Sequence, residues 1–176
     1  GAEMMSTFGE DGLPPNPFLD NGNEALRAIH PQPHQGVCGD AIATLEGISR
    51  EALDAHAAES QKRAANAIEK GYFERSLIPV YSTSGELALD QEEFPRPGTT
   101  AESLAELKPS FEAIADYPLD EQGTTYRKLV NQKYPDLDVK HFHHAGNSSG
   151  VVDGAAALLL TSPEYAQRQG WKPRAR

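Results

Sequence analysis

The clearest pattern of hydrophobic and polar positions runs through residues 49–71. Apolar residues recur there at a spacing that places them on one face of a helix; they are Leu53, Ala57, Ala64 and Ile68. Ser49 is a good N-cap residue, because its hydroxyl can accept a hydrogen bond from a free amide of the first turn. Gly71 can end the helix, because glycine adopts the left-handed conformation at no steric cost. The pattern therefore predicts a helix between Ser49 and Gly71.

Two strands are predicted after this helix. Residues 76–82 read SLIPVYS and residues 85–94 read GELALDQEEF, and both have the pattern of strands. Ser84 and Gly85 separate them and are typical turn residues. A short helix should follow over residues 99–109, TTAESLAELKP. Thr99 and Glu102 have the spacing of a capping box, and Pro109 ends the helix.

The last third of the chain contains a continuous apolar run, AAALLL, at residues 155–160. Such a run is typical of a strand that is covered on both faces. In the following segment Ser162 caps a helix, Pro163 occupies its first position and Gly170 ends it. A strand followed by a helix suggests the start of an α/β layer. Since one buried parallel strand cannot form a sheet, we expect the chain to be part of something larger.

The opening region has a different character. Residues 10–23, EDGLPPNPFLDNGN, are rich in proline, glycine and asparagine and are predicted to form a loop. A loop of this length inside a compact domain indicates either a function or a missing partner surface.

Composition excludes several classes of function. The 176 residues suit one domain, and the formal net charge is −10 with no basic cluster beyond the short terminal KPRAR, so a nucleic-acid partner is not expected. The one cysteine excludes an internal disulfide and fits a reducing compartment. No apolar run approaches the ~20 residues needed to cross a bilayer, and the first residues lack the pattern of a secretory signal. We therefore expect a cytoplasmic protein that binds no membrane.

Cys38 lies close to His34 and His30, so it is a candidate nucleophile or metal ligand. Cysteine catalysis needs a thiolate that is stabilised by a base or by the N-terminus of a helix. The segment GVCGDAIATLEG places Cys38 just before a predicted helix, which lowers a thiol pKa only a little. An inert cysteine is therefore favoured.

The segment HFHH raises the question of a metal site. Zinc needs three or four ligands in a tetrahedral arrangement. On a strand His141 and His143 would share one face and His144 would lie on the other. No CxxC or HExxH pattern accompanies them. The favoured alternative is a polar strand end with a histidine in a hydrogen-bond network, and we predict no metal.

Residues 145–150, AGNSSG, gather small residues and hydroxyl groups before the apolar run. Glycine permits a ligand to approach the backbone closely, and serine hydroxyls can bond to amides. The same residues can also form an ordinary tight turn. The composition of this segment does not decide between the two.

Residues 145–160, AGNSSGVVDGAAALLL, resemble the A-G-N-x-S-G-x-N-D-G-A-A-A-L-L-L segment of the thiolases, the acyl-CoA C-acyltransferases. Val152 replaces the usual second asparagine. Further similar segments occur in the same order: GAEMMS at the start, HQGVCGDAIATLEGISREALD and its extension to IPV, RPGTTAESLAELKPSF, and the final LTSPEYAQRQGWKPRAR. The poorest matches are Gly9 to Gln32 and the insertion-like segment Asp116 to His141.

The resemblance implies an α/β fold that is an incomplete thiolase. Residues 1–6 would be the end of the N-terminal domain, residues 7–150 the loop domain that binds coenzyme A (CoA), and residues 151–176 the first strand and helix of the C-terminal domain. Thiolases interconvert acyl-CoA plus acetyl-CoA with a 3-ketoacyl-CoA plus CoA, as in fatty acid metabolism and β-oxidation. Their nucleophilic cysteine, GHP histidine, second cysteine and NEAF motif are absent from this sequence. We expect those parts to lie before Gly1 and after Arg176 and the chain alone to be inactive.

The resemblance also assigns binding residues, with no catalytic or metal-binding residue among them. They are His34 and Gln35 beside the pantetheine arm, Arg96 and Phe111 near the adenine end, and Ala145 and Ser149 lining the pantetheine channel. Gln35 replaces the usual methionine, which alters the pocket wall. CoA or acyl-CoA would be a substrate, with no resident cofactor.

The implied partners are the remaining thiolase domains, in a homodimer or homotetramer when the enzyme is complete. The preferred acyl chain and the direction of the reaction stay open. An alternative is a non-catalytic module that binds acyl-CoA or a partner subunit. Whether a neighbouring reading frame encodes the missing motifs separates the two hypotheses.

Overall fold

The computed structural model describes residues 1–5 and 18–175. These residues form two compact units, one within residues 18–150 and the other from the two ends of the chain, residues 1–5 and 151–175. The domain limits implied by the thiolase resemblance stay a prediction. No helix among the described residues combines the length and the apolar character that a membrane span requires.

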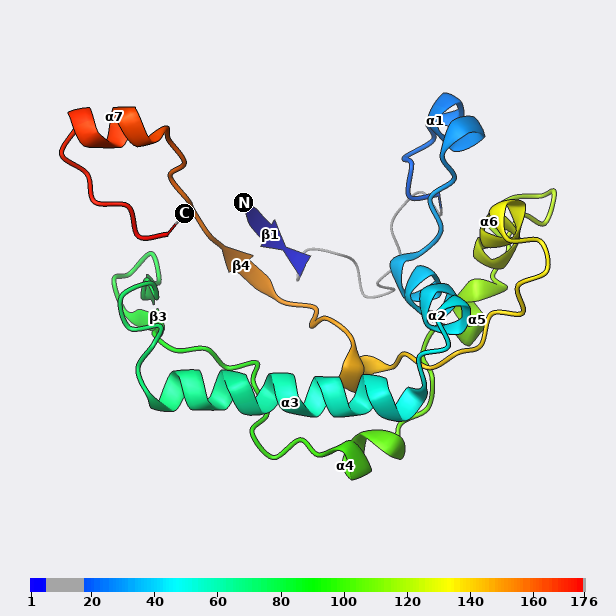
Figure 1. Ribbon diagram of the computed structural model, residues 1–176, viewed down its shortest axis with the longest axis horizontal. Helices are drawn as coiled ribbons and strands as arrows, with labels where there is room; N and C mark the ends of the chain where they lie inside the picture. The colour runs from blue at the N-terminus through cyan, green and yellow to red at the C-terminus, as the bar shows by residue number, and fades with distance from the viewer. Residues whose placement is uncertain (6–17, 176) are drawn as a thin grey trace. The chain divides into compact units, whose positions relative to one another are not determined.

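The longest helix is α3 (Arg50–Glu69), which confirms the strongest sequence prediction (Figure 1). Ser49 caps it, with its hydroxyl accepting a hydrogen bond from the amide of Ala52. At the other end Gly71 has φ 66°, and the amide of Tyr72 donates to the carbonyl of Ala67 at 2.9 Å. This arrangement satisfies carbonyls that the last turn would otherwise leave free.

The apolar stripe of α3 is less covered than the spacing suggested. Leu53, Ala57 and Ala64 are half-buried, and Ile68 is 43% exposed. The one buried residue of the helix is Asp54. A charged residue therefore occupies the deepest position of this helix, and hydrogen bonds rather than apolar packing anchor it.

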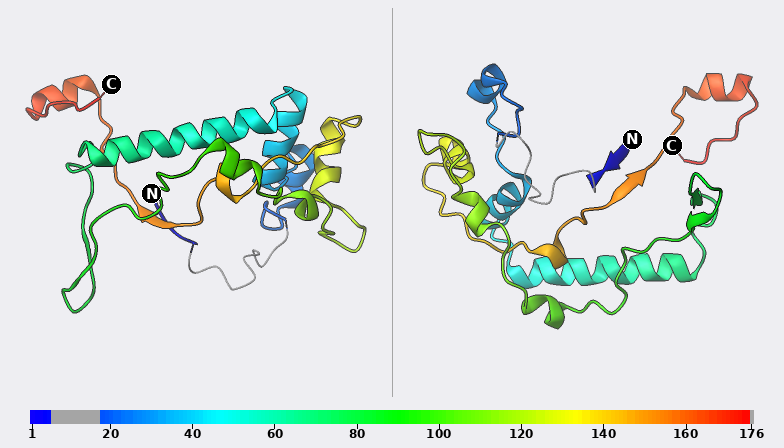
Figure 2. Two further views of the ribbon diagram at one scale, coloured as in Figure 1. Left: turned by 90° about the horizontal axis from the view of Figure 1, so that it is seen from below. Right: turned by 180° about the vertical axis from the view of Figure 1, so that it is seen from behind.

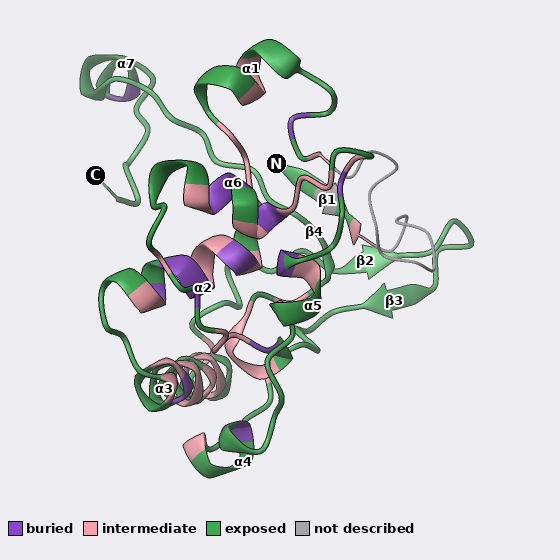
Figure 3. Cartoon of the chain, turned by 90° about the vertical axis from the view of Figure 1, so that its right-hand side faces the viewer, coloured by how far each residue is buried: buried purple, intermediate pink, exposed green. Residues whose placement is uncertain are grey.

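The hydrophobic core lies where α2 (Gln35–Leu45), α5 (Glu112–Ala115) and α6 (Tyr126–Lys133) meet. Figures 1 and 2 show these three helices side by side, and Figure 3 shows buried positions on the faces where α2 and α6 meet. The buried members of the core are Val37, Ala41, Ala115, Leu119, Tyr126, Leu129, Val130 and Val139. Helix α1 (Glu24–Ile29) contains no buried residue. The sequence pattern predicted neither α1, α5 nor α6, because one or two turns offer too few periodic positions.

Helix α4 (Ala101–Ala105) confirms the short predicted helix but corrects its cap. The capping box joins Thr100 and Ser103, not Thr99 and Glu102. The Thr100 hydroxyl accepts a hydrogen bond from the Ser103 amide at 3.2 Å, and the Ser103 hydroxyl accepts one from the Thr100 amide at 3.1 Å. With two adjacent threonines the spacing alone could not select the N-cap.

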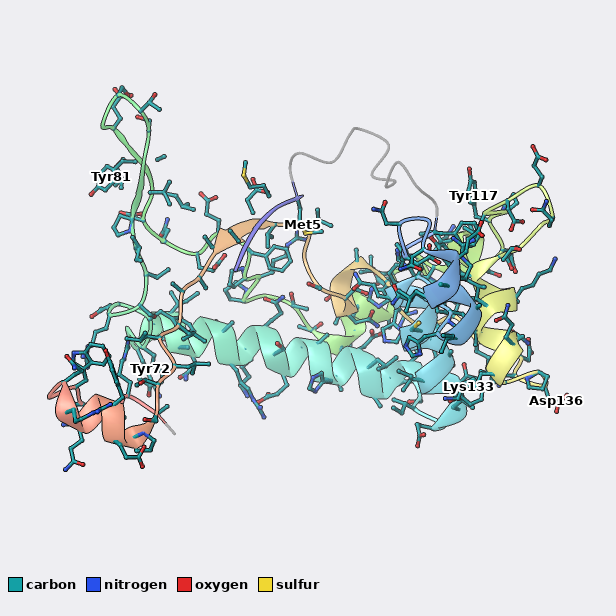
Figure 4. All side chains as sticks on the ribbon, turned by 90° about the horizontal axis from the view of Figure 1, so that it is seen from above. Met5, Tyr72, Tyr81, Tyr117, Lys133 and Asp136 are labelled. Atoms are coloured by element: carbon teal, nitrogen blue, oxygen red, sulfur yellow. The ribbon has the colours of Figure 1, made fainter. Side chains whose placement is uncertain are left out.

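The two predicted strands form an antiparallel pair, β2 (Val80–Tyr81) and β3 (Leu87–Leu89), but each is much shorter than the segments 76–82 and 85–94 that the sequence indicated. Gly85 in the turn has φ 86°, a conformation that favours glycine. All residues of both strands are exposed, and Figure 4 shows Tyr81 on this hairpin.

In the terminal unit β1 (Ala2–Met4) pairs with β4 (Asp153–Ala155) in antiparallel orientation, with Ala2 opposite Ala155. Helix α7 (Pro163–Arg168) confirms the last predicted helix. Its N-cap is Ser162, Pro163 stands in the first turn, and Gly170 follows the helix with φ 67°. Mixed helices and strands agree with the α/β class, although both described sheets are two-stranded and antiparallel.

The run at residues 155–160 is not the doubly covered strand that the sequence predicted. Strand β4 ends at Ala155, and three leucines after it are exposed: Leu158 by 90%, Leu159 by 75% and Leu160 by 88%. Strand β1 is three residues long, and its pairing ends with a hydrogen bond from the Ala156 amide to the Gly1 carbonyl. Within the described residues these leucines have neither a paired strand nor a covering layer.

Candidate functional site

The N-terminus of α2 holds the first two predicted binding residues. His34 is the N-cap, and its Nδ1 accepts a hydrogen bond from the Gly36 amide at 3.1 Å. Its ring contacts those of Phe111 and Tyr126, with centroid distances of 5.5 and 5.7 Å. Burial lowers the pKa of His34, so the ring is neutral near pH 7. Gln35 is the first helical residue and is exposed.

Phe111 reaches this point because residue 36 has no side chain. A Cβ atom on Gly36 would lie 2.4 Å from the Phe111 ring, which is far inside van der Waals contact. Phe111 is the N-cap residue of α5 and packs against the core. The structure therefore brings Phe111 next to His34, although the thiolase resemblance assigns His34 to the pantetheine arm and Phe111 to the adenine end.

Ala145 and Ser149 lie in a separate segment. Ala145 begins a short 3-10 helix, η2 (Ala145–Asn147), and both residues are exposed. A Cβ atom on Gly146 would lie 2.4 Å from Leu104 of α4, so the backbone of η2 approaches α4 closely. One backbone hydrogen bond, from the Ser110 amide to the His143 carbonyl at 2.9 Å, joins this segment to the residue before Phe111.

Arg96 lies on the exposed chain after the hairpin. Its amide donates to Gln61 of α3 at 2.7 Å, and its guanidinium forms no salt bridge with any described residue. Two residues earlier, the ring of Phe94 lies against Gly150, where a Cβ atom would be 2.4 Å away. Phe94 thus contacts the end of the Ala145–Gly150 segment, and Arg96 follows Phe94 by two residues in the chain.

Sequence reasoning missed the residue that holds these segments together, Asp40 of α2. Its buried carboxylate accepts hydrogen bonds from the amides of Phe142 and His143, both at 3.0 Å, and from the rings of His141 at 2.8 Å and His143 at 2.7 Å. Burial opposes the charged form, but these bonds outweigh it and lower the pKa of Asp40. The sequence contained one signal for a buried Asp40, because this acidic residue lies on the same helix face as the apolar residues Val37 and Ala41.

Asp54 of α3 has the same role for the following residues. It accepts from Arg50 at 2.7 Å, from His144 Nε2 at 2.9 Å and from Asn147 at 2.9 Å. Burial raises its pKa and the bond from Arg50 leads the effects that lower it, with a lower pKa as the result. His144 Nδ1 accepts from the Gly146 amide at 3.0 Å, which leaves Nε2 as the donor.

The histidine segment therefore differs from the expected strand end. Residues 141–144 form no strand, and all three histidines bond to buried aspartates. Among the residues that the structure describes, no cluster of histidine, cysteine, aspartate and glutamate can hold a metal ion.

Cys38 lies inside α2 rather than before it. Its sulfur is 3.6 Å from the carbonyl of Pro33, and burial raises the pKa of its thiol. A raised pKa favours the thiol over the reactive thiolate. This environment favours an inert cysteine, in agreement with the sequence argument.

Comparisons with known proteins define the class to which this arrangement belongs. The sequence profile of the family described as "Thiolase, N-terminal domain" matches residues 20–115, which is more than half of the chain. The chain belongs to the thiolase family.

Two curated relatives agree with this assignment. The acetyl-CoA acetyltransferase of Thiocystis violacea is 38% identical over 148 residues, which are 82% of this chain and 31% of the relative. The peroxisomal 3-ketoacyl-CoA thiolase of Yarrowia lipolytica is 32% identical over 97% of this chain and 36% of the relative. The crystal structure of the dimeric peroxisomal thiolase of Saccharomyces cerevisiae is 30% identical with a TM-score of 0.48, covering 63% of this chain and 28% of the yeast chain. The chain thus spans about a third of the length of its curated relatives.

Proposed function

We propose that this chain supplies the CoA-binding part of a thiolase-type acyltransferase, which interconverts acyl-CoA plus acetyl-CoA with 3-ketoacyl-CoA plus CoA. The observation that supports the proposal most is the similarity, 32% identity over 97% of this chain, to a protein named 3-ketoacyl-CoA thiolase. CoA is a substrate in this reaction, and no resident cofactor is needed.

The proposed role of each binding residue follows from the chemistry of its side chain and from its exposure. His34, neutral and held by the Gly36 amide, presents a polar edge beside the pantetheine arm, and Gln35 stands next to it at the exposed start of α2. Phe111 offers an apolar surface near the adenine. Ala145 leaves room for the pantetheine chain, and the Ser149 hydroxyl can bond to one of its amides.

Arg96 takes the anionic end of the ligand. It is exposed, and its guanidinium has no salt-bridge partner among the described residues, so a phosphate would not have to displace one. A guanidinium and a phosphate form charge-assisted, bidentate hydrogen bonds.

The chemical step belongs to residues other than those of this chain. Acyl transfer in this family passes through a cysteine thiolate, and the raised pKa of Cys38 keeps its sulfur protonated. The remaining thiolase domains supply the nucleophile and the proton-transfer groups, in a homodimer or homotetramer. The expected cytoplasmic location and the exclusion of nucleic acid and membrane stay predictions.

Calorimetric titration of the purified chain with CoA tests the binding role, and an assay with acetoacetyl-CoA plus CoA tests the chemical step. We expect binding without turnover. Absence of any CoA binding would contradict the proposal. Turnover that Cys38→Ser abolishes would make the chain itself catalytic, and binding of acyl-CoA with no gain of activity on adding the other thiolase domains would favour the non-catalytic module.

A further inference from the structure

Helix α6 lies within the segment Asp116–His141, after the residues 20–115 that match the family profile. It is an integral part of the core. Tyr126, Leu129 and Val130 are each at most 7% exposed and pack in the same cluster as Val37 of α2.

Tyr126 contacts the predicted pantetheine residue His34 directly. The two ring centroids are 5.7 Å apart with an interplanar angle of 55°, and Phe111 faces the His34 ring at 5.5 Å. These are the ring contacts of His34 within the described part of the chain. With Nδ1 bonded to the Gly36 amide, three elements together determine how the imidazole is oriented.

The next residue, Arg127, ties α6 to the middle of α2. Its guanidinium bonds to Asp116 at 2.7 and 2.9 Å and to His141 Nε2 at 2.9 Å. Because arginine can only donate, His141 Nε2 must accept, and its Nδ1–H donates to Asp40 at 2.8 Å. Two consecutive residues of α6 therefore hold α2 at two points. Tyr126 contacts His34, and Arg127 is joined to Asp40 through His141. His34 and Asp40 are six residues apart.

We propose that Tyr126 is a positioning residue, which orients His34 for the pantetheine arm of CoA, and that α6 supports the CoA-binding region of this chain. The proposal rests on the proposed function. Tyr126 itself need not touch the ligand. Its ring packs against the ring of His34, and the hydrogen bonds of Arg127 hold α6 against α2.

Three variants of the full chain test this role. Tyr126→Leu removes the ring but keeps an apolar side chain, and Tyr126→Phe keeps the ring. Leu129→Ala is the matched control, because Leu129 is buried in the same helix and core and makes no ring contact with His34. Each variant is first shown to be folded by circular dichroism. The dissociation constant for CoA and the NMR titration and chemical shifts of the His34 ring are then measured.

We expect Tyr126→Leu to raise the dissociation constant for CoA by about ten-fold, since a binding side chain whose orientation is not held by its neighbours loses affinity. The chemical shifts of the His34 ring and the midpoint of its titration should also change. The dissociation constants of Tyr126→Phe and Leu129→Ala for CoA should stay within about two-fold of that of the unmodified chain. An equal loss in Leu129→Ala, or unchanged affinity in Tyr126→Leu, would overturn the proposal. If the unmodified chain binds no CoA, the proposed function fails. An unperturbed His34 ring in Tyr126→Leu refutes the positioning role itself.

Discussion

At the scale of single residues, hydrogen bonds determine which buried groups carry charge. Asp54 is 2% exposed, yet Arg50, His144 and Asn147 all donate to it. A buried carboxylate with several donors stays ionised, and the pKa of Asp54 is lowered accordingly. The network fastens η2 to α3 without any apolar contact at its centre.

Removing this carboxylate should therefore be costly. We expect Asp54→Ala to lower the free energy of unfolding by about 3 kcal/mol, because it leaves Arg50 and His144 without their partner. Glu59→Ala is the control in the same helix, since Glu59 forms an exposed pair with Arg63 and its loss should cost much less. Urea denaturation measures both, and equal effects would contradict a structural role for Asp54.

Asp40 makes stability depend on acid pH. Its folded-state pKa lies below the unfolded value, so its contribution is complete above about pH 4 and is lost as pH falls toward the folded pKa. Asp40→Asn removes this titration, and its free energy of unfolding should fall less steeply in the same interval. Urea denaturation at a series of pH values between about 5 and 3 provides the comparison. Parallel curves for the two proteins would mean that Asp40 does not titrate differently on folding.

Arg96 is expected to contribute to CoA affinity through the nucleotide end of the ligand. One partly exposed charge-assisted contact corresponds to about a ten-fold rise in the dissociation constant of Arg96→Ala. Pantetheine lacks the phosphates, so its binding should not change. Arg63→Ala, at another exposed arginine, should leave both ligands unaffected. Calorimetry that gives equal CoA affinity for Arg96→Ala and the unmodified chain would identify Arg96 as an ordinary surface residue.

At the scale of elements, the contact between α2 and α5 depends on an absent side chain. Gly36 lies so close to Phe111 that the ring occupies the place of a Cβ atom. Phe111 in turn faces His34 at 5.5 Å, so the same contact shapes the predicted binding region.

Gly36→Ala should displace Phe111 and destabilise the chain by about 1–3 kcal/mol, as overpacking of a core does. Gly98→Ala is the matched control, because no atom lies within 4 Å of its Cβ position and its φ is not positive. Thermal unfolding followed by circular dichroism compares the two variants. A Gly36→Ala protein as stable as Gly98→Ala would mean that Phe111 moves aside freely.

Elements with strong local signals could be predicted from the sequence. Ser49 with Gly71, and Ser162 with Gly170, mark the ends of α3 and α7, because caps act within one turn. Helix α6 could not be predicted, since its eight residues are stabilised by distant core partners. The bonds from Asp40 to His141 and His143 also escaped prediction, because they join residues more than 100 positions apart. The contact between His34 and Phe111 was predicted neither by a local pattern nor by the thiolase resemblance, because it joins residues that are far apart in the chain.

At the scale of the whole molecule, a chain with a formal net charge of −10 nevertheless exposes many large apolar side chains, and two groups of them are candidate association surfaces. One is the hairpin, where Val80, Tyr81 and Leu87 are each more than half exposed. The other is the segment Leu158–Leu160 after β4. Charge repulsion between copies opposes association, and burial of apolar surface favours it.

We expect burial to prevail at Leu158–Leu160, so that the isolated chain self-associates. The three leucines follow directly from β4, and an extended apolar segment without a strand neighbour can pair with another chain. Sedimentation velocity should show oligomers that the double variant Leu158→Glu/Leu160→Glu converts to monomers, because glutamates resist desolvation and add like charge. Leu87→Glu on β3 is the control for an exposed leucine elsewhere. A monomeric unmodified chain would contradict the expectation, and oligomers that Leu87→Glu alone dissolves would place the associating surface on the hairpin.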